Sequence, residues 1–268
     1  MVTGMLGSRA RSALEGTRFV DLRWVDETAS TNDDVLALAR EGAREGVVVV
    51  ADHQIAGRGR LDRSWTAPPR SSLLVSILLR PELVPEQAHL VTTAVACSAV
   101  DGCVQVAGVE PRIKWPNDLL LASDGHPRAK VAGVLAESIV EGGRLVAVVV
   151  GIGVNVNWPE VPDELTGIAV ALNHVAGHEI DRQDLLVAFL RRLDEWCDSL
   201  GHERGRTNLL ARYRELCETL GARVRVDLPN GSVNGVARDV DSAGHLVVET
   251  ADGLQVIVAG DVIHLRPA

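Results

Sequence analysis

The chain has 268 residues, of which 46% are hydrophobic and 24% are charged, and its formal net charge at pH 7 is -9. This length allows one large domain and a small second one, and the composition is typical of a folded globular protein. The acidic balance disfavours a general nucleic-acid binder but leaves room for a local cationic site. We expect no membrane span, because no segment is long and apolar enough.

The N-terminal segment carries charges and has no apolar stretch, so it is not a secretory signal. We interpret residues 1–20 as a flexible tail. The four cysteines are widely spaced and include no Cys-x-x-Cys pair, which disfavours a zinc site. We therefore expect reduced thiols in a cytoplasmic protein.

The first half of the chain predicts both helices and strands. Residues 30–34 supply N-cap and acidic residues before an apolar-periodic run, so a helix begins there and ends near Gly42. The apolar runs 47–51 and 71–79 are predicted strands, and 86–105 is a predicted buried helix. Two short strands, 112–114 and 119–121, enclose a Trp-Pro-Asn-Asp turn, and 130–140 with 144–150 predict a hairpin.

The second half predicts two amphipathic helices over 181–199 and 206–220. After Gly221, short apolar clusters alternate with turn residues, which indicates roughly five strands in a small β-barrel. The predicted fold class is therefore α+β. A mixed β-sheet with helices occupies 21–220, and the barrel occupies 221–268.

The densest cluster of candidate binding residues is the segment from Gly57 to Trp65, Gly-Arg-Gly-Arg-Leu-Asp-Arg-Ser-Trp. Glycines let the backbone approach a ligand, arginines bind carboxylates and phosphates, and Trp65 offers a flat face. The alternatives are a solvated basic loop or an RNA-binding arginine tract. A small-anion site fits better, because the tract is short and the chain is acidic. No Walker loop occurs in the sequence.

Three other motifs could contribute to a ligand site. Lys114-Trp115-Pro116-Asn117-Asp118 presents a cation, an amide and a carboxylate, although it could be an ordinary turn. Lys130 begins an apolar strand that contains Gly133, so it contacts a ligand or extends to solvent. The segment 151–158 ends a strand with two glycines and two asparagines, which fits a ligand wall or a turn.

Taken together, the order and spacing of these motifs resemble the biotin–protein ligase family. The resemblance covers residue 24 to the C-terminus. Its motifs are Ser30-Thr31-Asn32, His53-Gln54 with Gly57–Trp65, Lys114–Asp118, Lys130–Leu135 and Gly151–Asn155. It implies a class II synthetase/lipoate-ligase-like catalytic domain and an SH3-like C-terminal barrel. It also implies two steps: biotin and MgATP give biotinyl-5′-AMP and pyrophosphate, and biotin then passes to a lysine of a biotin carboxyl carrier protein of acyl-CoA carboxylases.

The resemblance also implies residue roles. The expected biotin contacts are Ser30, Thr31, Asn32, Gln54, Gly57, Arg58, Gly59, Arg60, Lys130, Gly133, Leu135 and Gly151. The expected ATP contacts are Arg60, Arg63, Trp65, Lys114, Asn117 and Asn155. Lys130 and Arg60 would be catalytic, and Asp118 would bind Mg²⁺. ATP and Mg²⁺ would serve as co-substrate and metal, with biotin as substrate and no permanently bound cofactor.

The chain departs from the family in two places. Leu61-Asp62 replaces the basic residue and glycine often found there, so the loop should order less tightly on biotin. Fewer than 25 residues precede the catalytic pattern, too few for the winged helix-turn-helix of some relatives. We therefore expect no DNA-binding role and no membrane partner, and a monomer or a weak ligand-dependent dimer.

Several other functions remain open at this point. A lipoate ligase or octanoyl transferase would share the catalytic fold, but the arginine loop and terminal barrel favour biotin. A non-catalytic biotin sensor or RNA-binding module would use the loop alone. Lys114, Asp118 and Lys130 favour an enzyme. An α+β domain with only a basic surface loop would make every motif a coincidence.

Overall fold

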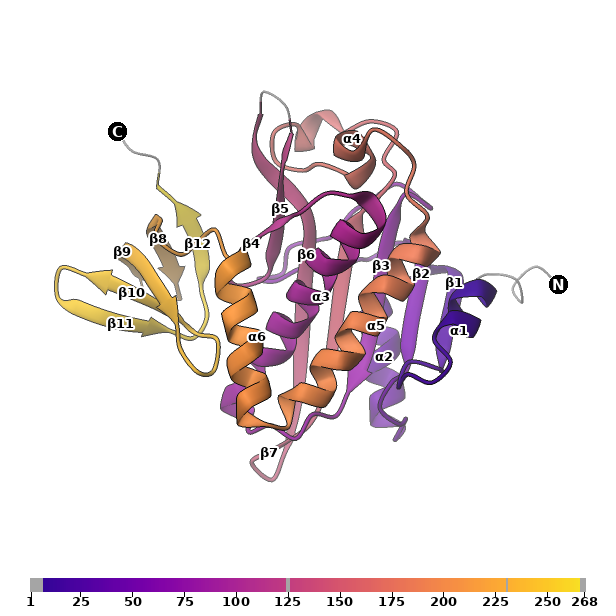
Figure 1. Cartoon of the computed structure of the whole chain (residues 1–268), viewed down its shortest axis with the longest axis horizontal. Coiled ribbons are helices and arrows are strands. Elements are labelled where there is room, and N and C mark those ends of the chain that lie inside the picture. The colour runs from indigo at the N-terminus through magenta and orange to yellow at the C-terminus, as the bar shows by residue number, and fades with distance from the viewer. Residues whose placement is uncertain (1–6, 124–125, 230, 266–268) are drawn as a thin grey trace.

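The computed structural model describes residues 7–123, 126–229 and 231–265 (Figure 1). Its larger part is built on a seven-stranded sheet with the order β1-β2-β3-β7-β6-β5-β4. β1 is parallel to β2 and the other neighbouring pairs are antiparallel, which confirms the predicted mixed sheet. The strands are β1 (Leu22–Thr28), β2 (Val48–Gln54), β3 (Ser72–Leu79), β4 (Arg112–Lys114), β5 (Asp118–Ser123), β6 (His126–Glu141) and β7 (Arg144–Asn155).

Helices cover both faces of this sheet. α3 (His89–Ala107), α5 (Arg182–Leu200) and α6 (Glu203–Leu216) lie on one face, and α2 (Thr31–Arg40) lies on the other (Figure 1). Val48 and Val50 belong to the core under α3 and α5, whereas Val47 and Val49 pack under α2. Strands buried on both faces read as continuous apolar runs, which is why their sequences show little alternation. The shorter helical segments are α1 (Ser8–Ala13), η1 (Pro85–Gln87), η2 (Asp163–Leu165) and α4 (Leu172–Ala176).

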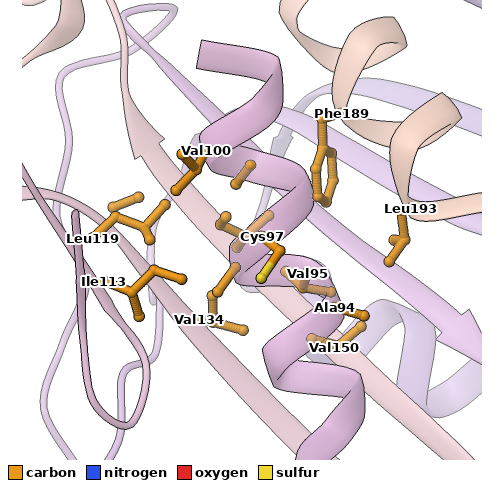
Figure 2. Packing of buried hydrophobic residues seen from close by; sticks show 14 of the residues in the cluster. Ala94, Val95, Cys97, Val100, Ile113, Leu119, Val134, Val150, Phe189 and Leu193 are labelled. Carbon is orange, nitrogen blue, oxygen red and sulfur yellow. The ribbon is translucent and has the colours of Figure 1, made fainter. Parts of the chain in front are cut away.

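Helix α3 lies at the centre of the main core. Figure 2 shows Cys97 and its helical neighbours between strand residues such as Val134 and the α5 side chains Phe189 and Leu193. Among the described residues, Pro85–Ala107 is long and apolar enough to cross a membrane by length and composition, which corrects the expectation from sequence. However, 78% of that window is buried inside the fold, as in the central helix of a folded core.

The N-terminal residues differ from the expected flexible tail. Residues 8–13 form α1, and Ala10, Leu14 and Phe19 have no exposed surface. Arg18 forms ion pairs with Glu45, Asp194 and Asp198. The segment is too short for a strong periodic signal, and the contacts that hold it include α5, far away in sequence. Residues 1–6 of the expected tail lie outside the described residues.

The C-terminal part is a five-stranded antiparallel sheet with the order β11-β10-β9-β8-β12. This confirms the predicted number of strands. β11 and β12 lie at opposite ends of the strand order, so the described residues form a sheet here and not the closed barrel expected from the sequence. The strands are β8 (Arg223–Leu228), β9 (Gly231–Val240), β10 (Leu246–Thr250), β11 (Gly253–Ile257) and β12 (Asp261–His264).

The turn between β4 and β5 attaches this sheet to the larger part. Trp115 is fully buried, and its indole Nε1 donates to the Gly244 carbonyl at 3.1 Å. The Trp115 backbone N–H donates to Thr219 Oγ1 at 3.0 Å. The C-terminal sheet is therefore held against the turn that the sequence singled out as a candidate site.

Candidate active site

A pocket lies between the N-terminus of α2, the strands β2, β3, β6 and β7, and the loop 57–65. Its free volume is about 50 Å³. Most of the predicted biotin contacts line it. The lining residues are Ser30, Thr31, Asn32, Gln54, Arg58, Gly59, Arg60, Trp65, Leu74, Val75, Ser76, Asn117, Lys130, Gly133, Val134, Leu135, Gly151, Ile152 and Gly153.

Polar side chains form a continuous hydrogen-bonded wall along the pocket. Gln54 Oε1 accepts from the Thr31 backbone N–H at 2.8 Å and lies 2.9 Å from the Thr31 hydroxyl. That hydroxyl is also 2.7 Å from the Ser76 hydroxyl, which donates to Asn32 Oδ1 at 2.6 Å. Asn32 Nδ2 in turn donates to Glu137 Oε2 at 2.9 Å. The wall therefore joins α2, β2, β3 and β6.

This wall holds fewer protons than its oxygen atoms require. The Ser76 proton is committed to Asn32 Oδ1, because the Asn32 amide nitrogen faces a carboxylate. The Thr31 hydroxyl has one proton, yet both Gln54 Oε1 and Ser76 Oγ lie within hydrogen-bond distance. One close oxygen–oxygen contact is thus left without a proton. A ligand that brings N–H groups would supply the missing donor.

The indole of Trp65 lies against two glycines that face each other across β6 and β7. Gly133 pairs with Gly153, and a Cβ at these positions would lie 3.1 Å and 2.6 Å from Trp65 ring carbons. Within the described chain, Trp65 Nε1 is buried without a hydrogen-bond partner. Small-molecule sites usually enclose roughly 300–1,000 Å³. A ligand of that class therefore requires Trp65 to move.

The loop 57–65 forms a tight hairpin over the pocket. The Gly59 N–H donates to the Arg63 carbonyl at 2.6 Å, which closes the turn. Leu61 and Asp62 at its tip have φ values of 56° and 57°. This left-handed backbone costs a non-glycine residue roughly 1–2 kcal/mol. The two residues that depart from the family pattern therefore occupy the strained positions.

Arg58 anchors the base of this hairpin. Its guanidinium donates to both Glu137 carboxylate oxygens, at 3.2 and 2.7 Å, and Nη2 lies 2.7 Å from Asp33 Oδ1. Arg58 therefore joins the loop to β6 and to the first turn of α2.

Arg60 and Arg63 point away from Arg58 and toward the C-terminal sheet. Arg60 donates to Asn117 Oδ1 at 2.9 Å and to the Gly260 carbonyl at 3.3 Å. Arg63 forms a 2.5 Å ion pair with Asp261. Burial lowers the pKa of Arg60 from its ordinary value, but a guanidinium remains charged at neutral pH. The loop is thus attached to both parts of the molecule.

The sequence contains only two lysines, Lys114 and Lys130. Lys130 Nζ lies 2.6 Å from Asp118 Oδ1 and 5.4 Å from the Trp65 ring centroid. Asn155 Nδ2 donates to the Lys130 carbonyl at 3.3 Å, so β7 fixes the backbone that carries this amine. Lys130 is therefore held in the pocket by an acid, an aromatic face and a backbone contact.

Several predicted site residues do not line the pocket in this conformation. Lys114 lies on β4, near the C-terminal sheet. Burial lowers the pKa of His264 in that sheet, and the positive charge of Lys114 lowers it further. The other four are Gly57, Arg63, Asp118 and Asn155, each beside or bonded to a lining residue. Their ligand contacts stay predictions.

Ser76 and Glu137 belong to the polar wall, and sequence reasoning missed both. Ser76 is the one polar residue inside an otherwise apolar strand segment, so its isolation was a usable signal. Glu137 follows Gly133 and Leu135 at the two-residue period of a strand face. Extending that face by one step would have identified it.

Two oxygen-bearing residues next to Lys130 suit a hard cation. Asn155 Oδ1 is buried and, among the described residues, has no hydrogen-bond partner. Asp118 supplies a carboxylate close by, through its ion pair with Lys130. The described residues contain no group of three His, Cys, Asp or Glu side chains that could hold a metal alone. Mg²⁺ commonly binds one or two protein oxygens together with substrate phosphates, and each of these residues offers an oxygen of that kind.

Comparison with known proteins decides the family. The Biotin/lipoate A/B protein ligase family model matches residues 24–155, and the Biotin protein ligase C terminal domain model matches 219–265. A biotin--[acetyl-CoA-carboxylase] ligase of Mycobacterium tuberculosis is 36% identical over 94% of this chain and 91% of its own length. The chain belongs to the biotin protein ligase family.

Other relatives extend the likeness to this family. A bifunctional ligase/repressor of Bacillus subtilis is 35% identical over 88% of this chain and 72% of its own length. The Aquifex aeolicus biotin protein ligase, solved with biotin and ATP, superimposes with a TM-score of 0.77 at 27% identity, covering 93% of this chain and all of that one. Both the sheet with its helices and the C-terminal sheet are thus those of biotin protein ligases.

Proposed function

We propose that this chain condenses biotin with ATP to biotinyl-5′-AMP and pyrophosphate, and then transfers biotin to a lysine of a biotin carboxyl carrier protein. The observation that carries the proposal is the donor-poor wall of Thr31, Asn32 and Ser76 in the pocket that also holds Lys130. Relatives named as biotin ligases, and a neighbour solved with biotin and ATP, support it.

The polar wall suits the ureido ring of biotin. One of its two ring N–H groups would supply the donor missing around Thr31 and Ser76. Ser30 is buried at the N-cap of α2, and in the described structure its side chain makes no capping bond, so its hydroxyl can donate to the ureido oxygen. The positive end of the helix dipole favours the same oxygen. The dithiolane ring of lipoate has no N–H group, which argues against the nearest alternative substrate.

Lys130 and Arg60 would act on the reacting anions. The biotin carboxylate oxygen forms a bond to the α-phosphorus of ATP while the bond to pyrophosphate breaks. Both reactants are negative, so fixed cations offset their repulsion and stabilise the charge that develops. In the second step, a neutral lysine amine of the carrier attacks the biotinyl carbonyl carbon, AMP leaves with the electron pair of the broken bond, and the attacking nitrogen releases a proton. The ion pair with Asp118 holds Lys130 in orientation between steps.

Asp118 and Asn155 would hold Mg²⁺ together with ATP phosphate oxygens. When bound, the ion neutralises phosphate charge and polarises the α-phosphorus. Asn155 would offer its Oδ1, which has no partner among the described residues, while the nitrogen of the same planar amide keeps its bond to the Lys130 carbonyl. The same two residues would thus orient the metal and the lysine together.

The hairpin 57–65 would close the site after ligands enter. Trp65 must leave the glycine pair to admit biotin, and its ring is then free to pack against adenine. A closed hairpin keeps water from the reactive adenylate. Gly57 and Gly59 suit this role because their backbone can lie directly on a ligand.

The direct test is biotin-dependent pyrophosphate release from MgATP, with lipoate as the comparison acid. We expect pyrophosphate release from MgATP with biotin but not with lipoate. Lys130→Ala should lower the rate by on the order of 10²-fold or more. Arg144→Ala, an exposed change in the β6–β7 hairpin, is the neutral control. Release with lipoate but not biotin would mean that the substrate is wrong. Biotin binding without release would mean a sensor rather than an enzyme.

A further inference from the structure

Glu137 links two parts of the site that sequence reasoning treated separately. Its Oε2 accepts from Asn32 Nδ2 at 2.9 Å and from Arg58 Nη2 at 2.7 Å, and its Oε1 accepts from Arg58 Nη1 at 3.2 Å. One carboxylate oxygen therefore joins the polar wall to the base of the hairpin. Glu137 does not line the pocket, so it has no direct ligand role in this conformation.

We propose that Glu137 is a positioning residue that couples occupancy of the ureido end of the pocket to closure of the hairpin 57–65. The proposal rests on the function proposed above. Biotin binding fixes Asn32, Asn32 fixes the Glu137 carboxylate, and that carboxylate holds Arg58 with the glycines beside it over the ligand.

The chemistry of the group supports this role. The carboxylate receives three N–H groups, which uses most of its acceptor capacity and defines its orientation. A bidentate arginine–carboxylate pair also fixes direction as well as distance. Its partly exposed setting, with the Glu137 side chain 30% and the Arg58 side chain 39% exposed, gives it little weight in overall stability. Its effect should therefore appear in loop position rather than in folding.

The chain contains a matched control. Asp33 Oδ1 also lies 2.7 Å from Arg58 Nη2, so it attracts the same guanidinium. Asp33 does not line the pocket, and no hydrogen bond joins it to the polar wall in the described structure. If Arg58 needed only a nearby negative charge, loss of either acid would have the same effect. If Glu137 couples the two, only its substitution should prevent biotin binding from closing the hairpin 57–65.

The experiment compares Glu137→Gln with Asp33→Asn in the full chain. Trypsin cleavage after Arg58, Arg60 and Arg63 reports hairpin closure, measured with and without saturating biotin and ATP. We expect wild type and Asp33→Asn to be protected by ligand. Glu137→Gln should bind biotin at higher concentration yet stay cleavable at saturation. Its KM for biotin should rise about tenfold, the usual scale for losing one charge-assisted hydrogen bond, and kcat should fall as well because Arg60 lies on the same hairpin.

The outcomes separate this inference from the proposed function. Wild type that neither binds biotin nor releases pyrophosphate contradicts the proposed function itself. The coupling alone is overturned if wild type is active while Glu137→Gln is protected by ligand as well as Asp33→Asn and has an unchanged KM for biotin. A thermal melt of each variant checks folding, and Glu137→Asp provides a second test. Its shorter carboxylate keeps the charge but not both contacts, so it should show partial loss of protection.

Discussion

At the scale of the residue, the tightest constraint on the pocket is the space next to Gly151 on β7. A Cβ added there would lie 2.2 Å from Asn32 Oδ1 and 3.0 Å from Ser76 Oγ. Gly151→Ala should therefore displace Asn32 from the wall. We expect the KM for biotin to rise about 10- to 100-fold, which corresponds to the roughly 1–3 kcal/mol of an overpacked site. Steady-state pyrophosphate release measures it.

The control for this change is Gly201→Ala, at the C-terminus of α5. Gly201 has helical backbone angles and no heavy atom within 4 Å of an added Cβ in the described structure. Its KM for biotin should match that of wild type. An unchanged KM in Gly151→Ala would mean that the wall is not the biotin site.

Single residues were predictable from sequence where a motif named them, and not where neighbours decided their role. Thr31, Gln54 and Lys130, each named by a motif, line the pocket, and their ligand contacts stay predictions. Ser76 was hidden because its contacts depend on α2 lying over β3. Trp65 was expected in the loop, but its position on Gly133 depends on strand pairing that no local pattern encodes.

At the scale of the element, periodic segments were predicted well and contact-dependent ones were not. The helices α3 and α5 have strong local signals, and the structure has them at nearly the expected bounds. The β6–β7 hairpin was also predicted, but β6 begins at His126 and β7 continues to Asn155, so both strands are longer than expected. Strand β1 was missed, since its seven residues mix apolar with charged side chains and it is held by parallel pairing with β2. Helix α1 was also missed, because it is short and is stabilised by contacts with α5.

The N-terminal segment gives a prediction about stability. Leu14 has no exposed surface and belongs to the main core. Leu14→Ala should therefore lower the free energy of unfolding by about 2–5 kcal/mol, as for other buried leucines. Val20→Ala, at a position 58% exposed, should change it by no more than about 0.5 kcal/mol. Urea denaturation measures both. If Leu14→Ala and Val20→Ala lowered the free energy of unfolding equally little, residues 7–20 would be a flexible tail.

At the scale of the whole molecule, the junction between the two parts should be sensitive to acid. His89, the first residue of α3, is partly buried with its Nε2 atom enclosed, and Gly244 of the C-terminal part lies so close that an added Cβ would be 2.8 Å from the His89 ring. Burial lowers the pKa of His89 to about 4, with His245 and Arg60 adding to the effect and Asp241 opposing it. His89 is therefore neutral in the folded protein at neutral pH.

The sign of the pH effect follows from proton uptake. Above pH 6.5 neither state protonates His89, so its contribution to stability is fully present. Between about pH 6.5 and 4 only the unfolded chain binds the proton, and the free energy of unfolding falls by on the order of 3 kcal/mol. His89→Gln should show a flatter pH dependence of urea denaturation over this range. If the free energy of unfolding fell equally with pH in wild type and His89→Gln, His89 would not be the group responsible.

The scarcity of lysine affects how the protein would tolerate its own product. A biotinyl-adenylate acylates whatever amine it meets, so a ligase is exposed to its own reactive intermediate. This chain uses arginine almost throughout and carries side-chain amines only at Lys114 and Lys130. Guanidinium groups stay protonated and are poor acyl acceptors. Escaping adenylate would thus find very few targets on the enzyme itself. Self-labelling, if it occurs, can be assigned to single positions by mass spectrometry.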